Sequence, residues 1–306
     1  NFMKKNGLRA LIRKSKSKIQ GMDNDYEYTE WYEKTKPTKE ELLAQREEKF
    51  EYSPVFSIVI PLYATPDNFL GELLDSILAQ TYTNFEVCLA DGSENGKDKE
   101  EFIKKYIEEK NTGNKIKYKK LGKNLGIAGN TNEALKMAGG DYIVLADHDD
   151  VITENALYEC AKAINKEDCD CLYSDEDKLD MDGGSLFDPH FKPDFNIDLL
   201  ESVNYICHLF IIKRQLLDKI GMFNADYDGA QDYDFIFRVT ENAKKIVHIP
   251  KVLYHWRCHM NSTASNPQSK LYAFEAGARA IRAHYERTLP HIRIDGIEKG
   301  IDYGIY

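Results

Sequence analysis

Apolar residues recur with two alternating periods along the chain from residue 55 onward. The apolar runs VFSIVIP, FEVCLA and DYIVLAD, which start at residues 55, 85 and 141, are typical of β-strands, and KIKYKKL, which starts at residue 115, is interpreted as a further strand. Between them, apolar residues recur at helical spacing over residues 66–80 and 99–109, and residues 126–138 are interpreted as a loop that enters a helix. A further helix is expected over 153–164, with Thr153 as its N-cap. This alternation predicts an α/β fold with a doubly wound, mostly parallel sheet that carries helices on both faces.

Residues 1–52 lack this alternation and are expected to form a basic, helical extension or linker. The segment GLRALIRKSKSKI, residues 7–19, predicts a short basic amphipathic helix. Two interpretations of it stay open: the exposed tail of a preceding module, or a peripheral contact with an anionic membrane surface. Thr38 and Glu41 stand at capping-box spacing, which predicts a second helix after residue 38.

Composition and charge narrow the classes of protein. The 306 residues are 42% hydrophobic, which is enough for a sizeable core. The net charge is -10 although residues 1–20 carry seven Lys and Arg and no acid, so the remainder is strongly acidic and argues against a nucleic-acid partner. No apolar run reaches the roughly 20 residues that span a bilayer. The six cysteines show neither a CxxC pair nor zinc spacing, and reduced thiols predict a cytoplasmic protein.

Polar residues follow three of the predicted strands directly. Pro61 and Tyr63 follow the first strand, Asp91 follows the second, and Asp147-His148-Asp149-Asp150 follows the fourth. The carboxyl ends of strands in such sheets are where ligands bind. Three carboxylates in four residues repel one another, and a hard divalent cation would neutralise them. The sequence therefore predicts a ligand and metal site at this edge of the sheet.

Several blocks, taken in order, carry a family resemblance. SIVIPLY, LLDSILAQTYTNFEVCLADGS, KNLGIAGNTNEAL and GDYIVLADHDD together resemble family 2 (GT2) glycosyltransferases of GT-A fold, of the bacterial polysaccharide-synthesis type. The resemblance covers about residues 55–290. It implies a domain over 53–290, with a nucleotide-sugar half at 53–175 and an acceptor half at 176–290. Residues 291–306 would then be a C-terminal segment that leads toward a further module.

The resemblance implies a set of donor-binding residues. A carboxylate at the second strand end accepts a hydrogen bond from a base N–H, and the backbone turn after the first strand flanks the ring. Ala64 stands where the family usually has Asn, which affects the usual support of that turn. The nucleotide-sugar would be held by Pro61, Tyr63, Asp91, Asn124, Gly126, Asn130 and Asp147.

Two of these assignments have structural alternatives. Asp91 with the following Gly92 and Ser93 could form an ordinary turn. In the KNLGIAGN block, Asn130 or Thr131 could instead cap a helix, although a helix N-terminus also favours anions.

The resemblance gives the acidic cluster a metal role. Asp147 would face the ribose, and Asp149 would ligate Mn²⁺ or Mg²⁺ bridging the two phosphates of the leaving group. His255, in the context HWR, matches a position where a histidine becomes a further metal ligand, and His259 is the competing candidate. Asp150 is expected to support the cluster or to cap the following helix.

The catalytic base is the remaining assignment. In the family, an Asp preceded by Glu takes the proton from the acceptor hydroxyl, and Asp232 matches this position with Gln231 in place of the Glu. The alternative is that Asp232 caps a helix. Asp234 lies on another helical face and is a poor substitute. A second acidic run, residues 175–177, is interpreted either as an acceptor contact or as a solvated loop.

The expected function is inverting transfer of a sugar from a nucleotide-sugar, UDP- or dTDP-linked, to a hydroxyl of a growing saccharide. The acceptor would be a saccharide or a lipid-linked saccharide, at the inner face of the membrane and next to further glycosyltransferase modules. The alternative is a non-catalytic nucleotide- or saccharide-binding module within a larger polysaccharide synthase. A nucleotidylyltransferase would need a Gly-rich loop with Arg after the first strand, and PLYATPDN has none.

Overall fold

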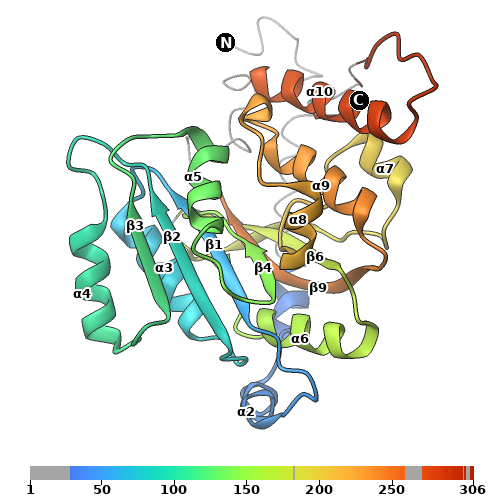
Figure 1. Ribbon diagram of the computed structural model, residues 1–306. Coiled ribbons are helices and arrows are strands. Elements are labelled where there is room, and N and C mark those ends of the chain that lie inside the picture. Colours follow the sequence, from blue (N-terminus) through green and yellow to red (C-terminus); the bar gives the residue numbers. More distant parts are fainter. Residues whose placement is uncertain (1–27, 182, 259–270, 299, 301–303) are drawn as a thin grey trace, which may run out of the picture.

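A computed structural model describes residues 28–181, 183–258, 271–298, 300 and 304–306 (Figure 1). Within these residues the strands form one nine-stranded sheet, whose main order is β3-β2-β1-β4-β8-β6-β9-β5, with β7 paired to β6. The predicted basic helix at residues 7–19 and the candidate His259 lie outside the described residues.

The first half of the sheet is parallel, as predicted. Its strands are β1 (Phe56–Leu62), β2 (Phe85–Asp91), β3 (Ile116–Lys120) and β4 (Tyr142–Leu145). The intervening helices are α3 (Asp67–Leu78), α4 (Glu100–Lys110) and α5 (Gly126–Leu135). β1 lies at the centre of this half because it pairs with both β2 and β4.

The second half of the sheet is mixed. Its strands are β5 (Val151–Ile152), β6 (Cys171–Leu179), β7 (Leu186–His190), β8 (Phe210–Lys213) and β9 (Ile246–Arg257). β8 runs antiparallel between β4 and β6, β9 runs parallel to β6, and the short β5 pairs with β9. The accompanying helices are α6 (Ala156–Glu167), α7 (Ile197–Ser202), α8 (Leu217–Ile220), α9 (Gln231–Asn242) and α10 (Leu271–Thr288), with 3-10 turns η1 (Arg214–Leu216) and η2 (Ala225–Tyr227).

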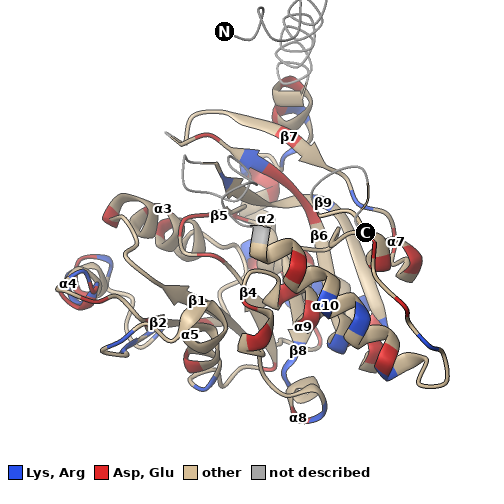
Figure 2. Ribbon diagram, turned by 90° about the horizontal axis from the view of Figure 1, so that it is seen from above, with Lys and Arg blue, Asp and Glu red and all other residues tan. Residues whose placement is uncertain are grey.

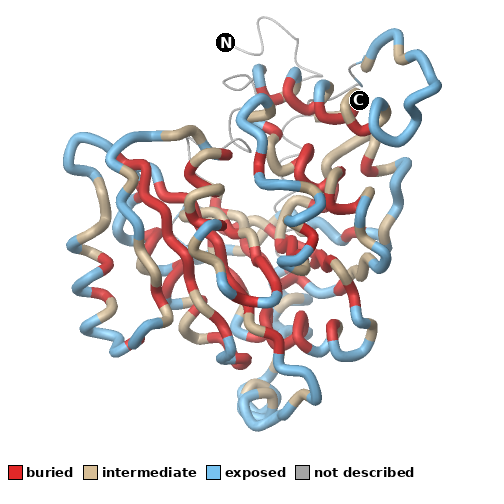
Figure 3. Tube along the Cα trace, viewed as in Figure 1, coloured by how far each residue is buried: buried red, intermediate tan, exposed pale blue. Residues whose placement is uncertain are grey.

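Apolar side chains cover both faces of the sheet. Ile58 and Ile60 of β1 pack into a cluster with α3, α4 and α6, whereas Val59 packs into a second cluster with α5, α9 and α10. All three side chains are fully buried. Successive residues of a strand point to opposite faces, so a continuously apolar strand requires two covered faces. Figure 3 shows the buried backbone running through the central strands.

The segment before β1 packs on the domain. Residues 28–35 are helical and α2 (Lys39–Glu47) follows, with the predicted capping box of Thr38 and Glu41 confirmed. The hydroxyl of Tyr28 donates to Asp177 at 2.5 Å, and Arg46 donates to the carbonyl of Ala79 at 2.8 Å. The domain boundaries at residues 52, 175 and 290 stay predictions.

Two local expectations are wrong. Thr153 does not cap α6, because its N–H donates to the carbonyl of Leu253 at 3.1 Å and keeps it with the β5–β9 pair; the N-cap is Asn155. Residues 175–177 are not a solvated loop, because they form part of β6 and at most 5% of any of them is exposed. Figure 2 shows this acidic run in red along β6, beside β9.

Candidate active site

The tips of β1 and β2 are tied together. Pro61 is buried near the end of β1, and Tyr63, just beyond it, is 48% exposed. Ala64 has a φ of 49°, in the left-handed region that Asn adopts more readily than Ala. Its N–H donates to the hydroxyl of Ser93 at 2.8 Å, which fixes the turn although the usual Asn is missing.

Asp91 organises the loop after β2. Its carboxylate is fully buried and accepts hydrogen bonds from the N–H of Ser93 at 2.9 Å, the N–H of Lys99 at 2.7 Å and the hydroxyl of Tyr118 at 2.9 Å. These contacts fit the turn interpretation and also hold the carboxylate rigidly at the strand end. Base recognition by Asp91 stays a prediction.

The loop before α5 is held by two asparagines. The side-chain oxygen of Asn124 accepts from the N–H of Gly126 and from the amide of Asn130, at 3.0 and 3.1 Å. The oxygen of Asn130 accepts from the N–H of Leu125 at 3.1 Å. α5 begins at Gly126, so the alternative of Asn130 or Thr131 as N-cap is wrong; both lie inside the helix.

The acidic turn after β4 is supported by β9. The hydroxyl of Tyr254 accepts from the N–H of Asp147 at 3.1 Å and donates to the carboxylate of Asp150. The N–H of Arg257 donates to the other oxygen of Asp150 at 2.8 Å. Burial, and after it the charges of Asp149 and Asp147, raise the pKa of Asp150 well above its usual range. Asp150 thus supports the cluster, as predicted, and does not cap α6.

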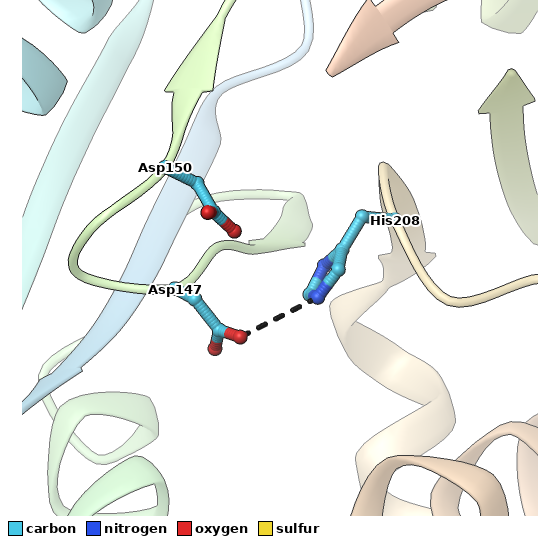
Figure 4. A group of neighbouring side chains, drawn as sticks. All are labelled: Asp147, Asp150 and His208. Atoms are coloured by element: carbon cyan, nitrogen blue, oxygen red, sulfur yellow. Dashed lines mark ion pairs between the residues drawn. The ribbon is translucent and has the colours of Figure 1, made fainter. Parts of the chain in front are cut away.

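A histidine that sequence reasoning missed completes the cluster. The Nε2 atom of His208 lies 3.5 Å from the carboxylate of Asp147 (Figure 4). The ring of His208 stacks on Tyr254 with centroids 4.5 Å apart. Asp147, Asp150 and His208 each offer a ligand atom, and these atoms lie within 4.8 Å of one another. Burial works in the opposite direction, but Asp147 raises the pKa of His208 to about 9. Two carboxylates and an imidazole could hold Mn²⁺ or another divalent cation.

Asp232 lies in the first turn of α9 and faces the same region. The N-cap is Ala230, so the alternative of Asp232 as the cap is wrong. The amide of Asn204 donates to its carboxylate at 2.8 Å, and burial raises the pKa of Asp232. Asp234 is engaged elsewhere, in an ion pair with Arg238 at 2.7 Å.

One cavity of about 40 Å³ joins residues from distant parts of the chain. Pro61 of β1, Asp147 and His208 of the cluster, and Gln231 and Asp232 of α9 all line it. The structure therefore brings the first strand end, the acidic cluster and the predicted base to one place.

His255 lies elsewhere. Its Nδ1 atom is 2.5 Å from the carboxylate of Asp177, and its Nε2 atom is 3.3 Å from the hydroxyl of Tyr32. It borders a groove of about 870 Å³ between the N-terminal segment and β5, α6 and β9, which neither Asp149 nor Asp232 lines. The assignment of Asp149 and His255 as ligands stays a prediction, and the structure does not bring His255 into the Asp147–Asp150–His208 group.

Comparison with known proteins identifies the family of the chain. The family described as glycosyl transferase family 2 matches residues 57–221, which is more than half of the chain. The chain belongs to glycosyl transferase family 2. Two curated relatives of this glycosyltransferase chain are an uncharacterized protein, y4gI, of Sinorhizobium fredii and the O-antigen biosynthesis protein RfbC of Myxococcus xanthus. They are 36% identical over 249 residues and 29% identical over 262 residues.

The alignments cover 80% and 85% of this glycosyltransferase chain but only 27% and 20% of the two relatives. The chain thus spans about a quarter of their length or less.

Solved structures show the GT-A fold. S. aureus TarS 1-349 in complex with UDP-GlcNAc has a TM-score of 0.59 at 23% identity, covering 76% of this chain and 66% of that one. The mannosyltransferase PcManGT of Pyrobaculum calidifontis, in complex with GDP-Man and Mn²⁺, has a TM-score of 0.54 at 16% identity, covering 82% and 70%. Among the described residues of the glycosyltransferase, no helix is both long and apolar enough to cross a membrane.

Proposed function

We propose that the chain transfers a sugar from a nucleotide-diphosphate sugar to a hydroxyl of a growing saccharide, with inversion at the anomeric carbon. The observation that carries the proposal is the cavity of about 40 Å³, in which the carboxylate of Asp232 on α9 faces the Asp147–Asp150–His208 group at the end of β4. A general base must lie within reach of the hydroxyl whose proton it takes, and the leaving diphosphate needs positive charge nearby.

The donor is proposed to be UDP- or dTDP-linked. The TarS structure contains UDP-GlcNAc. In this chain Pro61, Tyr63 and Asp91 lie at the carboxyl ends of adjacent parallel strands, where ligands bind in sheets of this kind. A cavity of about 40 Å³ has room only for a few atoms at the reacting centre. The nucleotide would therefore lie along the open strand ends, toward Asn124, Gly126 and Asn130.

Asp147, Asp150 and His208 fit a divalent cation, because they combine hard oxygen ligands with an imidazole whose Nε2 atom lies 3.5 Å from the carboxylate of Asp147. Mn²⁺ or Mg²⁺ bound there would neutralise the charge that develops on the departing diphosphate. His208 is proposed as the histidine ligand ahead of His255, whose two ring nitrogens already face Asp177 and Tyr32. Asp149, on the same turn, remains a proposed ligand.

Asp232 is proposed as the base. Its carboxylate accepts the proton of the acceptor hydroxyl while that oxygen bonds to the anomeric carbon, and the bond from that carbon to the diphosphate oxygen breaks with its electron pair on the phosphate. One displacement inverts the centre. The raised pKa of Asp232 brings it closer to the pKa values that suit a base near neutral pH. The amide of Asn204 holds the carboxylate from one side.

The cellular setting is a proposal as well. The name of RfbC, an O-antigen biosynthesis protein, supports cell-surface polysaccharide synthesis, with a saccharide or lipid-linked saccharide as acceptor. Because the relatives are several times longer than this chain, further glycosyltransferase modules are proposed as partners. The cytoplasmic face of the membrane is the proposed location.

The Asp232→Asn variant tests the base. We expect release of nucleoside diphosphate from the donor, in the presence of a saccharide acceptor, to fall at least about a hundredfold, while donor affinity measured by calorimetry changes less than about threefold. Unchanged turnover would remove Asp232 from the mechanism. If wild type binds a nucleotide but never turns over, the alternative of a non-catalytic binding module gains.

Manganese binding tests the ligand set. We expect His208→Ala to weaken Mn²⁺ binding by about tenfold or more, and His255→Ala to leave it within about twofold. Asp149→Asn decides whether that carboxylate is also a ligand. The reverse pattern for the two histidines would return the assignment to His255.

A further inference from the structure

A buried ion pair lies beside the candidate metal cluster without belonging to it. Glu176 of β6 is 5% exposed, and Lys192, two residues after β7, is 6% exposed. The ammonium of Lys192 lies 3.3 Å from the carboxylate of Glu176. The pairing of β6 with β9 places Glu176 opposite Tyr254, the residue whose ring stacks on His208.

Both members of the pair hold the backbone that carries His208. The N–H of His208 donates to Glu176 at 3.1 Å. The ammonium of Lys192 donates to the carbonyl of His208 itself and, at 2.6 Å, to the carbonyl of Ile206. The peptide groups on both sides of the His208 Cα atom are therefore fixed by one ion pair.

The ring of His208 has little else to orient it. Its Nδ1 atom is buried and has no hydrogen-bond partner among the described residues, and its Nε2 atom faces Asp147 at 3.5 Å. A ligand histidine is usually held by a hydrogen bond to its second ring nitrogen. Here the hydrogen bonds of Glu176 and Lys192 to the backbone of residues 206–208, which we call the backbone clamp, set the direction of the ring together with the stacking on Tyr254.

Stability alone gives a weak reason for the pair. Removing two charges from water costs free energy that their attraction often does not return, and apolar replacements of buried pairs are frequently neutral or stabilising. The pair is nevertheless engaged at both charges with the same three-residue segment, 206–208. The hydrogen bonds of the pair therefore fix the position of residues 206–208 more directly than they stabilise the fold.

We propose that Glu176 and Lys192 are positioning residues that fix His208 against Asp147 and thereby set the affinity of the cluster for its cation. This inference rests on the proposed function, because it takes His208 as a metal ligand. Neither Glu176 nor Lys192 touches the cation or the substrates.

The test measures Mn²⁺ affinity by calorimetry in folded protein, with folding checked by circular dichroism. Glu176→Ala and Lys192→Met should each weaken Mn²⁺ binding by about 10- to 100-fold. Glu176→Gln keeps an oxygen that can accept from the N–H of His208, so it should recover most of the affinity. Glu159→Ala removes another ion pair, with Lys251, whose carboxylate is buried and which borders a different cavity from that of Asp147 and His208. It is the control and should change affinity less than about twofold.

A second background separates positioning from general loosening. In a His208→Ala protein, adding Glu176→Ala should produce no further loss of Mn²⁺ affinity, because the clamp then has no ligand to position. An equal loss in both backgrounds would overturn the proposal. So would Lys192→Met with wild-type affinity.

Failure of the proposed function gives a different result. If the wild-type protein binds no Mn²⁺, the metal role fails, and crystals of the metal-free wild type and Lys192→Met decide the clamp. A His208 ring that leaves Asp147 in the variant supports the positioning role. A ring that keeps its place refutes it. If Glu176→Ala and Lys192→Met do not fold, Glu176→Gln carries the test, by Mn²⁺ calorimetry and in crystals compared with those of the metal-free wild type.

Discussion

The hydroxyl of Tyr254 holds the acidic turn after β4 in place, and its removal should lower the stability of the protein. In Tyr254→Phe the ring stays and can still stack on His208, so only the hydroxyl is lost. That hydroxyl serves two partners, the carboxylate of Asp150 as donor and the N–H of Asp147 as acceptor.

The magnitude follows from the charge and burial of these partners. A hydrogen bond to a charged group contributes about 1.5–3 kcal/mol, and a neutral one about 0.5–1.5 kcal/mol. Asp150 is fully buried and would keep only the N–H of Arg257 among the donors described above. We therefore expect Tyr254→Phe to lower the free energy of unfolding by about 2–3 kcal/mol.

Urea unfolding at neutral pH without added metal measures this difference. Tyr82→Phe is the matched control, because its nearly buried hydroxyl donates at 2.7 Å to a neutral acceptor, the carbonyl of Pro54. It should lose about 1 kcal/mol. If Tyr254→Phe loses no more than Tyr82→Phe, the hydroxyl does not support the cluster as argued.

Two further predictions concern the helix packing and the donor loop. Burial raises the pKa of the Glu241 carboxyl, but hydrogen bonds from His284 and an arginine of α10 outweigh burial and lower this pKa below its ordinary 4.5. The stabilisation that these hydrogen bonds give is therefore present above pH 4.5 and is lost as the pH falls through the lowered pKa. Glu241→Gln should therefore lower the free energy of unfolding by about 2 kcal/mol at neutral pH. In urea titrations this difference should shrink as the pH falls below 4.5 and through the lowered pKa of Glu241, and a constant difference would contradict this. A Cβ on Gly92 would lie 2.5 Å from the amide of Asn130, so Gly92→Ala should cost about 1–3 kcal/mol and weaken UDP binding in a thermal-shift assay. Gly139→Ala, where the nearest atom is at 3.6 Å, should stay below about 1 kcal/mol, and equal effects of the two would refute the argument.

The local elements followed from the sequence because their signals are local. Apolar runs located β1, β2 and β4 to within a few residues, since a strand buried on two faces must be continuously apolar, and helical spacing located α3 and α4. Thr38 and Glu41 correctly predicted α2 because a capping box is also a local signal, contained within one helical turn. Thr153 failed because a tertiary strand pair, β5 with β9, holds that residue.

The acidic run of β6 shows the limit of composition. Three consecutive acids are usually solvated, and the sequence around residues 175–177 does not show which cations they contact. Their partners come from far along the chain: Lys192 for Glu176, His248 for Asp175 and His255 for Asp177. A buried charge is tolerated only where such partners exist, so the sequence alone favours the wrong environment.

By itself the sequence determined the parallel half of the sheet, the polar strand ends and the family. These depend on short-range patterns and on the order of blocks along the chain. The tertiary structure decided which histidine joins the acidic cluster. β8 runs antiparallel to β4 with Phe210 opposite Leu145. In an antiparallel pair, His208, two residues before Phe210, therefore faces Asp147, two residues after Leu145. Strand partners are chosen by packing across the whole sheet, and no local pattern around His208 or His255 encodes that choice.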